Sequence, residues 1–181
     1  MDSIARSIPL LRAFLVGVAC LATAPAANAD AVATIDRVRN SIVAIGTFER
    51  ARTPQFEFRG TGFVVGDGTV VATNAHVLPA VLDPVKIETL VVVLPGGGDG
   101  KVQYRDAKSL AVDVDSDLAL LKIAGDKLPA LKLRNSDGVK AGQDILFTGF
   151  PIGAVLGPYP ATHRGMRPRG GSRIAWRIGL R

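Results

Sequence analysis

Apolar runs alternate with turn-forming residues along most of the chain between residues 41 and 150. Seven of these runs are short and rich in Val, Ile, Leu and Phe, and they cover residues 41–48, 56–65, 69–74, 85–94, 101–112, 117–123 and 144–150. Short runs separated by Gly, Pro, Asp and Asn are typical of strands. The pattern therefore predicts an all-β fold, built as an antiparallel barrel or a sandwich.

One segment ahead of these runs has a helical period. Within residues 30–40, Val32, Ile35 and Val38 recur near helical spacing with charged residues between them, and Ile42 continues the series. A period close to that of an α-helix predicts a short amphipathic helix that leads into the β fold.

Two hairpin turns are indicated among the connections. Asp67-Gly68 lies between two apolar runs, and this dipeptide favours the positive φ angles of a type I′ turn. The segment Pro-Gly-Gly-Gly-Asp-Gly at residues 95–100 holds four glycines, which resist regular structure. We therefore expect residues 95–100 to be a second hairpin loop.

The first 29 residues have the pattern of an export signal. Two arginines precede the apolar run 13–22, and Ala-Asn-Ala at residues 27–29 places small side chains where a signal peptidase reads them. The apolar run is too short to span a bilayer as a helix. We interpret residues 1–29 as a signal peptide of a periplasmic or secreted bacterial protein whose mature chain starts near Asp30. Cys20, the only cysteine, lies inside that signal, so the mature chain has no thiol unless Cys20 is a lipid anchor.

The net charge of +6 is carried by one end of the chain. Residues 164–181 hold six arginines and no acidic residue, which leaves 16 of the 22 basic residues against 16 acidic residues elsewhere. The remainder is therefore neutral, and no nucleic acid is expected to bind the fold itself. The basic tail is compatible with binding to anionic lipid or nucleic acid, although runs of charge are usually just solvated.

His76 comes directly after the third apolar run. Taken alone it is weak evidence, because a histidine after a strand is commonly satisfied by a backbone carbonyl. Its context is a linked set of motifs: Gly-Thr-Gly-Phe at residues 60–63, Thr-Asn-Ala-His-Val at 73–77 and Asp-Leu-Ala-Leu-Leu at 117–121. In this order the motifs resemble those of the trypsin-like serine proteases, especially the bacterial HtrA-type branch. The resemblance covers about residues 41–165.

The resemblance implies both a fold and a chemistry. It implies a six-stranded antiparallel β-barrel, which is the N-terminal half of a two-barrel fold, and endopeptidase hydrolysis of polypeptides. By this resemblance His76 is the general base and Asp117 its orienting partner, because an imidazole must take the proton of a serine and a carboxylate must fix its tautomer. Asp113 and Asp115 are rivals that charge alone does not separate from Asp117. Asp117 is favoured because it directly precedes the apolar strand, and its structural alternative is a cap at a strand start.

The nucleophile of the family lies in a Gly-Asn-Ser-Gly-Gly-Pro-like loop of the second barrel, and no such loop is found here. The serines after Asp117 are Ser136 and Ser172. Ser136 precedes an apolar run that in the family still belongs to the first barrel, and Ser172 is followed by Arg and Ile where the oxyanion loop needs small residues. A second barrel needs on the order of 70 to 100 residues, and 30 follow Pro151. We therefore expect the second barrel to be largely missing and the chain to be catalytically incomplete.

These inferences define the predicted organisation and function. The signal peptide is residues 1–29, the first barrel with its helix is 30–150, and a truncated start of the second barrel with a divergent tail is 151–181. The predicted function is that of a serine endopeptidase homologue; the alternative is a non-catalytic exported binding or scaffold protein with a cationic tail. No cofactor or metal site is predicted, because the two histidines lie 87 positions apart without cysteine partners. The expected partners are polypeptide substrates, together with self-association through an exposed apolar barrel face.

Overall fold

The computed structural model describes residues 27–94, 102–150 and 160–167. The chain divides into two compact units, residues 1–34 and residues 35–181. The helix α2 (Ala27–Arg39) runs across that division. The predicted short helix is therefore confirmed, and it begins at Ala27 rather than at Asp30.

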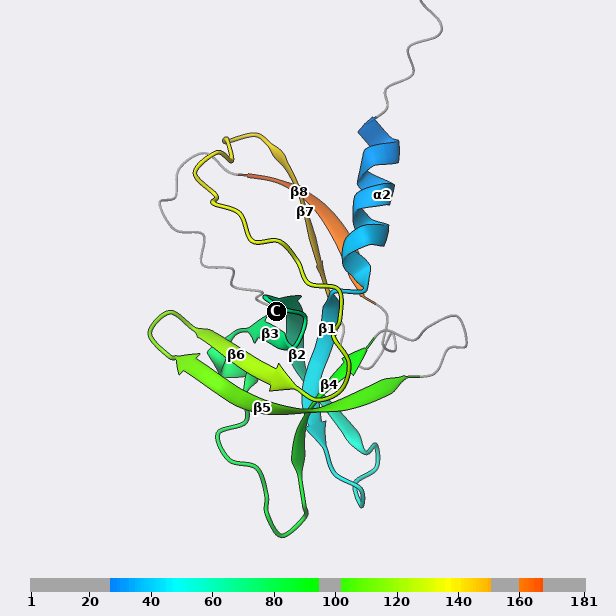
Figure 1. Cartoon of the computed structure of the whole chain (residues 1–181), viewed down its shortest axis with the longest axis vertical. Coiled ribbons are helices and arrows are strands. Elements are labelled where there is room, and N and C mark those ends of the chain that lie inside the picture. The colour runs from blue at the N-terminus through cyan, green and yellow to red at the C-terminus, as the bar shows by residue number, and fades with distance from the viewer. Residues whose placement is uncertain (1–26, 95–101, 151–159, 168–181) are drawn as a thin grey trace, which may run out of the picture. The chain divides into compact units, whose positions relative to one another are not determined.

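Six antiparallel strands close into a β-barrel (Figure 1). In chain order they are β1 (Ile42–Phe48), β2 (Phe56–Val65), β3 (Val70–Thr73), β4 (Thr89–Leu94), β5 (Gln103–Asp113) and β6 (Leu118–Ile123). The order around the barrel is β1-β2-β3-β6-β5-β4, and β4 pairs back with β1. The predicted six-stranded all-β barrel is thus confirmed, and the sandwich alternative is wrong because the sheet closes on itself.

Alternate residues of the strands fill the inside of the barrel. In β6 the alternation is strict, with Ala119, Leu121 and Ile123 buried and the residues between them exposed. A period of two is what a strand with one face on a core requires. The inner cluster consists of the buried residues Val43, Ile45, Val64, Val71, Val77, Leu90, Val92, Leu94, Ala107, Leu121 and Ile123.

The outer side of β1 is covered as well. Ile42 and Ala44 alternate with the inward-facing residues of β1 and pack with Val93 and Phe150 in a second cluster. β1 is therefore buried on both faces, which explains why its sequence is a continuous apolar run instead of an alternating one.

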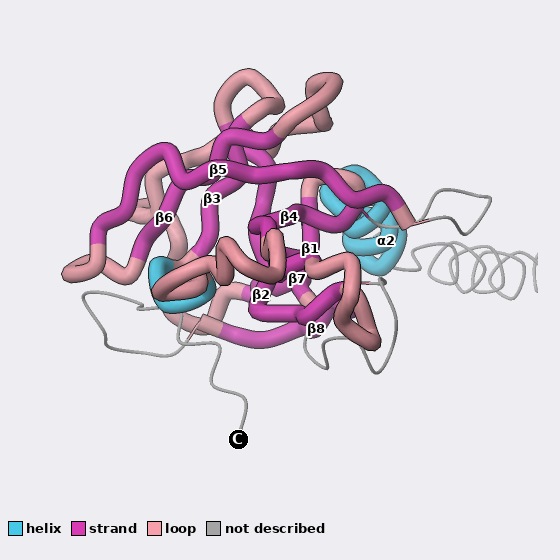
Figure 2. Tube along the Cα trace, turned by 90° about the horizontal axis from the view of Figure 1, so that it is seen from below, coloured by secondary structure: helices cyan, strands magenta, loops and turns pink. Residues whose placement is uncertain are grey.

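The last apolar run, residues 144–150, forms a strand that is not one of the barrel strands. β7 (Asp144–Gly149) pairs antiparallel with β8 (Ala161–Met166) in a separate two-stranded sheet (Figure 2). Phe150 ties this sheet to the barrel, because its N–H donates to Oγ1 of Thr61 in β2 at 3.0 Å. The pattern at 144–150 predicts a strand correctly, but apolar composition does not say which neighbour a strand pairs with.

The turn between β2 and β3 lies where the sequence places it but has a different form. Gly66 and Gly68 have φ angles of 63° and 91°, whereas Asp67 between them does not have a positive φ. The type I′ assignment is therefore wrong, because that turn needs positive φ at both central residues. Asp67 instead accepts hydrogen bonds from the hydroxyl and the backbone N–H of Thr69, the latter at 3.0 Å. Both bonds lower the pKa of the Asp67 carboxyl, and the bond from the hydroxyl has the larger effect.

Three predicted features fall on parts of the chain that the structure does not describe. The hairpin loop at residues 95–100 lies outside the described residues, although the strands on either side of it pair antiparallel, with Leu94 opposite Gln103. Most of the predicted signal peptide and the tail beyond Arg167 also lie outside the described residues.

Replacing Leu121 by Ala should destabilise the barrel by about 2–5 kcal/mol, because the side chain is fully buried and its removal leaves a cavity. Leu120→Ala is the matched control, since Leu120 is 37% exposed on the other face of β6, and we expect a change of about 0.5 kcal/mol or less there. Urea unfolding followed by circular dichroism measures both. Equal losses in the two variants would contradict this assignment of the inner and outer faces.

Candidate active site

The segment that carries His76 is held in place through the next residue, Val77. His76 lies in the 3-10 turn η2 (Ala75–Val77), which follows β3. Val77 is part of the inner core, and it lies so close to Gly60 that a Cβ at position 60 would come within 2.6 Å of the Val77 side chain. The guanidinium of Arg59 donates to the Val77 carbonyl at 2.9 Å. Glycine at position 60 therefore lets η2 pack against β2, while the His76 side chain remains 66% exposed.

Asp117 lies at the end of the tight turn that leads into β6. Its N–H donates to the carbonyl of Val114 at 3.2 Å, and its φ of 52° is left-handed. A residue with a Cβ adopts this conformation at a cost of roughly 1–2 kcal/mol, although aspartate tolerates it better than most residues. β3 and β6 pair so that Thr73 is opposite Ala119. This register brings the residues that follow β3 beside those that precede β6.

His76 and Asp117 form a hydrogen-bonded pair. The imidazole Nδ1 lies 2.8 Å from Oδ2 and 3.0 Å from Oδ1 of the carboxylate, and the backbone N–H of His76 donates to Oδ1 at 3.0 Å. An ionised carboxylate only accepts hydrogen bonds, so a neutral imidazole must carry its proton on Nδ1 to make this contact. Nε2 then keeps its lone pair, which is the protonation state that a general base requires.

The hydrogen bonds from His76 lower the pKa of the Asp117 carboxyl below its ordinary value. The backbone N–H of His76 contributes most, and the imidazole contributes next. The carboxylate therefore stays ionised to lower pH and is available to stabilise an imidazolium. Because the Asp117 side chain is 45% exposed, solvent screens part of this interaction.

The other two aspartates of the turn lie in different surroundings. Asp113 accepts a hydrogen bond from the N–H of Ser116 at 3.1 Å, and its contacts with the hydroxyl and N–H of Ser116 lower its pKa. Asp115 is exposed. Asp113 therefore stabilises the turn itself. The structure brings Asp117, rather than Asp113 or Asp115, against the imidazole.

One of the two serines that follow Asp117 in the sequence is described. Ser136 is exposed, and its carbonyl accepts the N–H of Val139 at 3.0 Å. Within the described part of the chain, the imidazole of His76 has hydrogen bonds to Asp117 and to no serine hydroxyl. Ser172 lies outside the described residues.

Asn74 is a residue of the site that the sequence interpretation missed. Its side-chain Nδ2 donates to the main-chain O of Asp117 at 3.0 Å and lies 3.3 Å from Oδ2. The one signal in the sequence is its place two residues before His76 in the Thr-Asn-Ala-His-Val motif. Asparagine is common in loops for local reasons, so that signal does not point to a contact with a residue so far along the chain.

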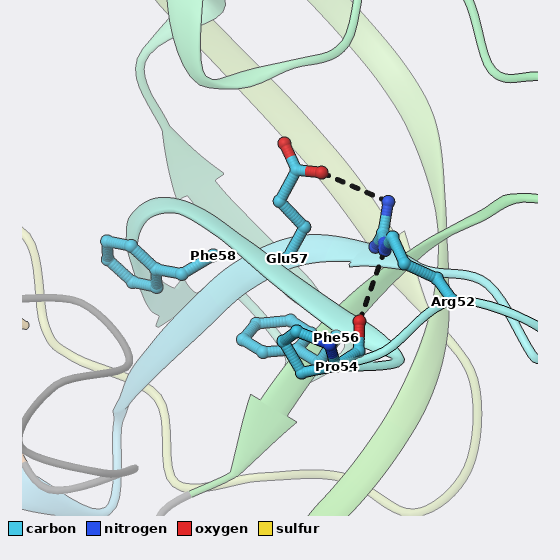
Figure 3. A pocket seen from close by; sticks show the side chains of 5 residues that line it. All are labelled: Arg52, Pro54, Phe56, Glu57 and Phe58. Atoms are coloured by element: carbon cyan, nitrogen blue, oxygen red, sulfur yellow. Dashed lines mark hydrogen bonds and ion pairs between the residues drawn. The ribbon is translucent and has the colours of Figure 1, made fainter.

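A hollow of about 350 Å³ lies at the connection between β1 and β2 (Figure 3). Its lining residues are Arg52, Pro54, Phe56, Glu57 and Phe58. Arg52 donates to Glu57 at 3.0 Å, to Glu88 at 3.2 Å and to the carbonyl of Thr47 at 2.8 Å. Its guanidinium is therefore engaged in holding the loop together, and the hollow shares no residue with the His76–Asp117 pair.

Across the described ranges, no group of three or more His, Cys, Asp or Glu side chains is arranged to hold a metal. Among the same residues, no helix is both long and apolar enough to cross a membrane.

Replacing Asp117 by Asn should lower the free energy of unfolding near neutral pH and have no effect in strong acid. The folded-state pKa of Asp117 lies below its unfolded value, so its contribution is present above the unfolded pKa and is lost as the pH falls through the folded pKa. Urea unfolding of both proteins over a pH series measures the difference. Asp115→Asn, in the same turn, is the control and should match the wild type throughout. A difference that widened on acidification would contradict the assigned contact.

Comparison with known proteins identifies the family. A family model described as a trypsin-like peptidase domain matches residues 60–169. The chain is 33% identical over 94 residues to a probable periplasmic serine endoprotease DegP-like of Pseudomonas fulva (strain 12-X), a match that covers 52% of this chain and 17% of that protein. It is 30% identical over 146 residues to serine protease HTRA4 of Mus musculus, which covers 76% of this chain and 28% of that protein. The chain thus spans less than a third of the length of these two relatives.

Solved structures share the fold. The crystal structure of Deg5 superposes with a TM-score of 0.62 at 25% identity, over 84% of this chain and 68% of Deg5. The HtrA-type protease AlgW with a tripeptide has a TM-score of 0.56 at 23% identity, over 79% of this chain and 41% of that protein, and supports the fold alone. Together with the family match over more than half of its length, these similarities mean that the chain belongs to the trypsin-like peptidase family, in the HtrA-type branch of serine proteases.

Proposed function

We propose that this chain is an exported serine endopeptidase homologue that carries the general base and the orienting carboxylate of a catalytic triad. The observation that supports this most directly is the contact of 2.8 Å between His76 Nδ1 and Asp117 Oδ2. The carboxylate also accepts a hydrogen bond at Oδ1 from the backbone N–H of His76. A carboxylate bound in this way fixes the imidazole in the tautomer that leaves Nε2 free.

The chemistry follows from that tautomer. Nε2 takes the proton of a hydroxyl nucleophile as the oxygen attacks a peptide carbonyl, and the resulting imidazolium is stabilised by the Asp117 carboxylate. The same nitrogen then returns the proton to the amine as the peptide bond breaks. Polypeptides are the substrates that this proposal implies. The names of the similar proteins, a probable serine endoprotease and a serine protease, support it.

We also propose that these 181 residues do not hydrolyse peptide bonds on their own. Ser136 lies in an exposed turn with no bond to the imidazole. Ser172 is followed by Arg173 and Ile174, whose side chains are unsuited to a loop that must bring backbone N–H groups close to a substrate oxygen. The proton acceptor is thus present, whereas neither serine has the surroundings of a nucleophile.

Export to the periplasm is part of the same proposal. The arginines, the apolar run and the small residues within residues 1–29 support a signal peptide. The name of the DegP-like relative, a probable periplasmic endoprotease, agrees with that location. The barrel would then begin shortly after the processed end of the chain.

A non-catalytic binding protein is the second candidate function, and the arginines of residues 164–181 are the observation that favours it. A cluster of arginines attracts anionic lipid or nucleic acid. Arg164, however, is already paired with Asp144 at 2.6 Å across the β7–β8 sheet. Part of the positive charge therefore serves the fold, and the His76–Asp117 contact has no role in such a protein.

A fluorophosphonate probe, which reacts with activated serine hydroxyls, tests the proposal directly. We expect no covalent labelling of the purified chain and no cleavage of a denatured protein substrate, because no serine is activated. An active trypsin-like protease in the same assay serves as the positive control, and His76→Ala should behave like the wild type. Labelling at Ser172 that disappears in His76→Ala would overturn the proposed inactivity.

Exposed apolar side chains on the outer side of the barrel should cause self-association, which we propose as a property of this chain. Leu118, Leu120 and Phe63 are 55%, 37% and 37% exposed, and Phe63 and Leu120 are both opposite Ala72 in the sheet. Ala111 of β5, which is also exposed, is opposite Leu120. Such a cluster of apolar residues is typical of an interaction surface.

Sedimentation velocity at increasing concentration measures this association. We expect Leu120→Asp to weaken it about tenfold, since a charge at the centre of an apolar contact must be desolvated. Leu133→Asp is the matched control, because Leu133 is 75% exposed but lies outside the strands. A monodisperse wild-type monomer at all concentrations would contradict the proposal.

A further inference from the structure

Asn74 occupies the one position between β3 and the 3-10 turn η2. Its side chain is partly buried and does not cap η2. Instead, Nδ2 reaches across to the turn before β6 and donates to the main-chain O of Asp117 at 3.0 Å, with Oδ2 of the same residue at 3.3 Å. Both neighbours of Nδ2 are oxygens that accept hydrogen bonds. The amide must therefore present its nitrogen, because its oxygen would face two further acceptors.

Asp117 needs such support because of its backbone. With a φ of 52° it holds a left-handed conformation that a residue with a Cβ leaves easily when nothing opposes it. Its N–H is held by the carbonyl of Val114 and its Oδ1 by the backbone N–H of His76. The bond from Asn74 holds the remaining main-chain group, the carbonyl, and so completes the restraint of the residue.

The same amide also limits how the carboxylate can rotate. His76 Nδ1 and Asn74 Nδ2 both approach Oδ2, at 2.8 Å and 3.3 Å, while the backbone N–H of His76 approaches Oδ1 at 3.0 Å. Donors arranged around both oxygens define one orientation of the carboxylate plane. Removing the amide would take one donor away from Oδ2.

We propose that Asn74 is a positioning residue of the catalytic pair, which acts through Asp117 by holding its left-handed backbone and its carboxylate plane so that His76 keeps its proton on Nδ1. This inference rests on the proposed function, since the tautomer matters to a general base. Asn74 itself does not touch the imidazole in any described contact; its effect on His76 is transmitted by the carboxylate.

The tautomer can be measured without enzymatic activity. In a protein labelled with ¹⁵N at histidine, the chemical shifts of the ring nitrogens give the ratio of Nδ1–H to Nε2–H forms at a pH where the imidazole is neutral. His76 and His163 are the two histidines of the sequence, and His163, which stacks on Phe147 in the β7–β8 sheet, serves as the internal reference. For the wild type we expect the Nδ1–H form to predominate at His76.

Two substitutions separate donation from packing. Asn74→Ala removes the donor, and we expect the Nδ1–H to Nε2–H ratio at His76 to fall about fivefold to tenfold. Asn74→Asp keeps the shape of the side chain but replaces the donor by an ionised acceptor facing Asp117. It should lower the ratio further, and protonating it at lower pH while Asp117 remains ionised should restore sharp, wild-type-like signals around Asp117. If packing were the whole role, Asn74→Asp would resemble the wild type more than Asn74→Ala does.

Thr73→Val is the matched control in the same segment. It removes the bond of 2.9 Å from Thr73 Oγ1 to the carbonyl of Thr61, which is not directed at Asp117. We expect it to lower the melting temperature without changing the His76 tautomer ratio. Signal dispersion in ¹H–¹⁵N spectra checks that each variant is folded; should Asn74→Ala fail to fold, Asn74→Asp compared with Thr73→Val decides the question.

The outcomes distinguish this inference from the function on which it rests. A wild-type protein with Nδ1–H at His76 and an unchanged ratio in both Asn74 variants would refute the positioning role and leave the proposed pair intact. A wild-type protein with the Nε2–H form predominant would contradict the pair itself. A fall in the ratio in Thr73→Val equal to that in Asn74→Ala would also refute the inference, because any local loosening would then suffice.

Discussion

The Asp117 carboxylate, held between the backbone N–H and the imidazole of His76, is the contact on which the site depends. It joins two segments that are distant in the sequence, and it exists because β3 and β6 are neighbours in the barrel, with Thr73 opposite Ala119. A barrel closed in another strand order would separate the two side chains whatever their identity. The chemistry of the site therefore depends on the strand order of the sheet as well as on the identity of the two residues.

Residues near His76 and Asp117 are packed into the barrel core, while the imidazole and the carboxylate themselves remain partly exposed. Val77, next to His76, is 5% exposed, and Ala119, near Asp117, is 2% exposed. Gly60 allows the Val77 segment to lie directly against β2. Side chains carried on segments whose neighbours are packed into a rigid core are held more accurately than those on free loops. The strained φ of Asp117 persists because the packed strand that follows limits its movement.

A base and its carboxylate are part of what peptide hydrolysis requires. A hydroxyl nucleophile and backbone donors for the developing oxyanion are also needed. On our proposal these are not supplied by Ser136 or Ser172, and the exposed apolar side chains Leu118 and Leu120 lie on the strand that begins beside Asp117. The His76–Asp117 pair and these exposed apolar side chains therefore occur in the same region of the barrel.

Local chemistry of the sequence determined the strands and the helix, and the resemblance of its motifs to a known family nominated the candidate pair. The apolar run at residues 117–123 predicts the strand β6, and the motifs around His76 and Asp117 resemble those of the family and nominate both residues. These features can be read from the sequence because they depend on neighbours within a few positions.

The tertiary structure alone decided which strands pair and which side chains contact each other. It placed residues 144–149 in a sheet outside the barrel, gave Gly66 and Gly68 rather than Asp67 the positive φ angles, and brought Asp117 instead of Asp113 to the imidazole. It also showed the reach of Asn74 to Asp117. Each of these depends on a hydrogen bond or a strand register between segments that meet only when the barrel closes, and closure is a property of the whole chain that no short stretch of sequence encodes.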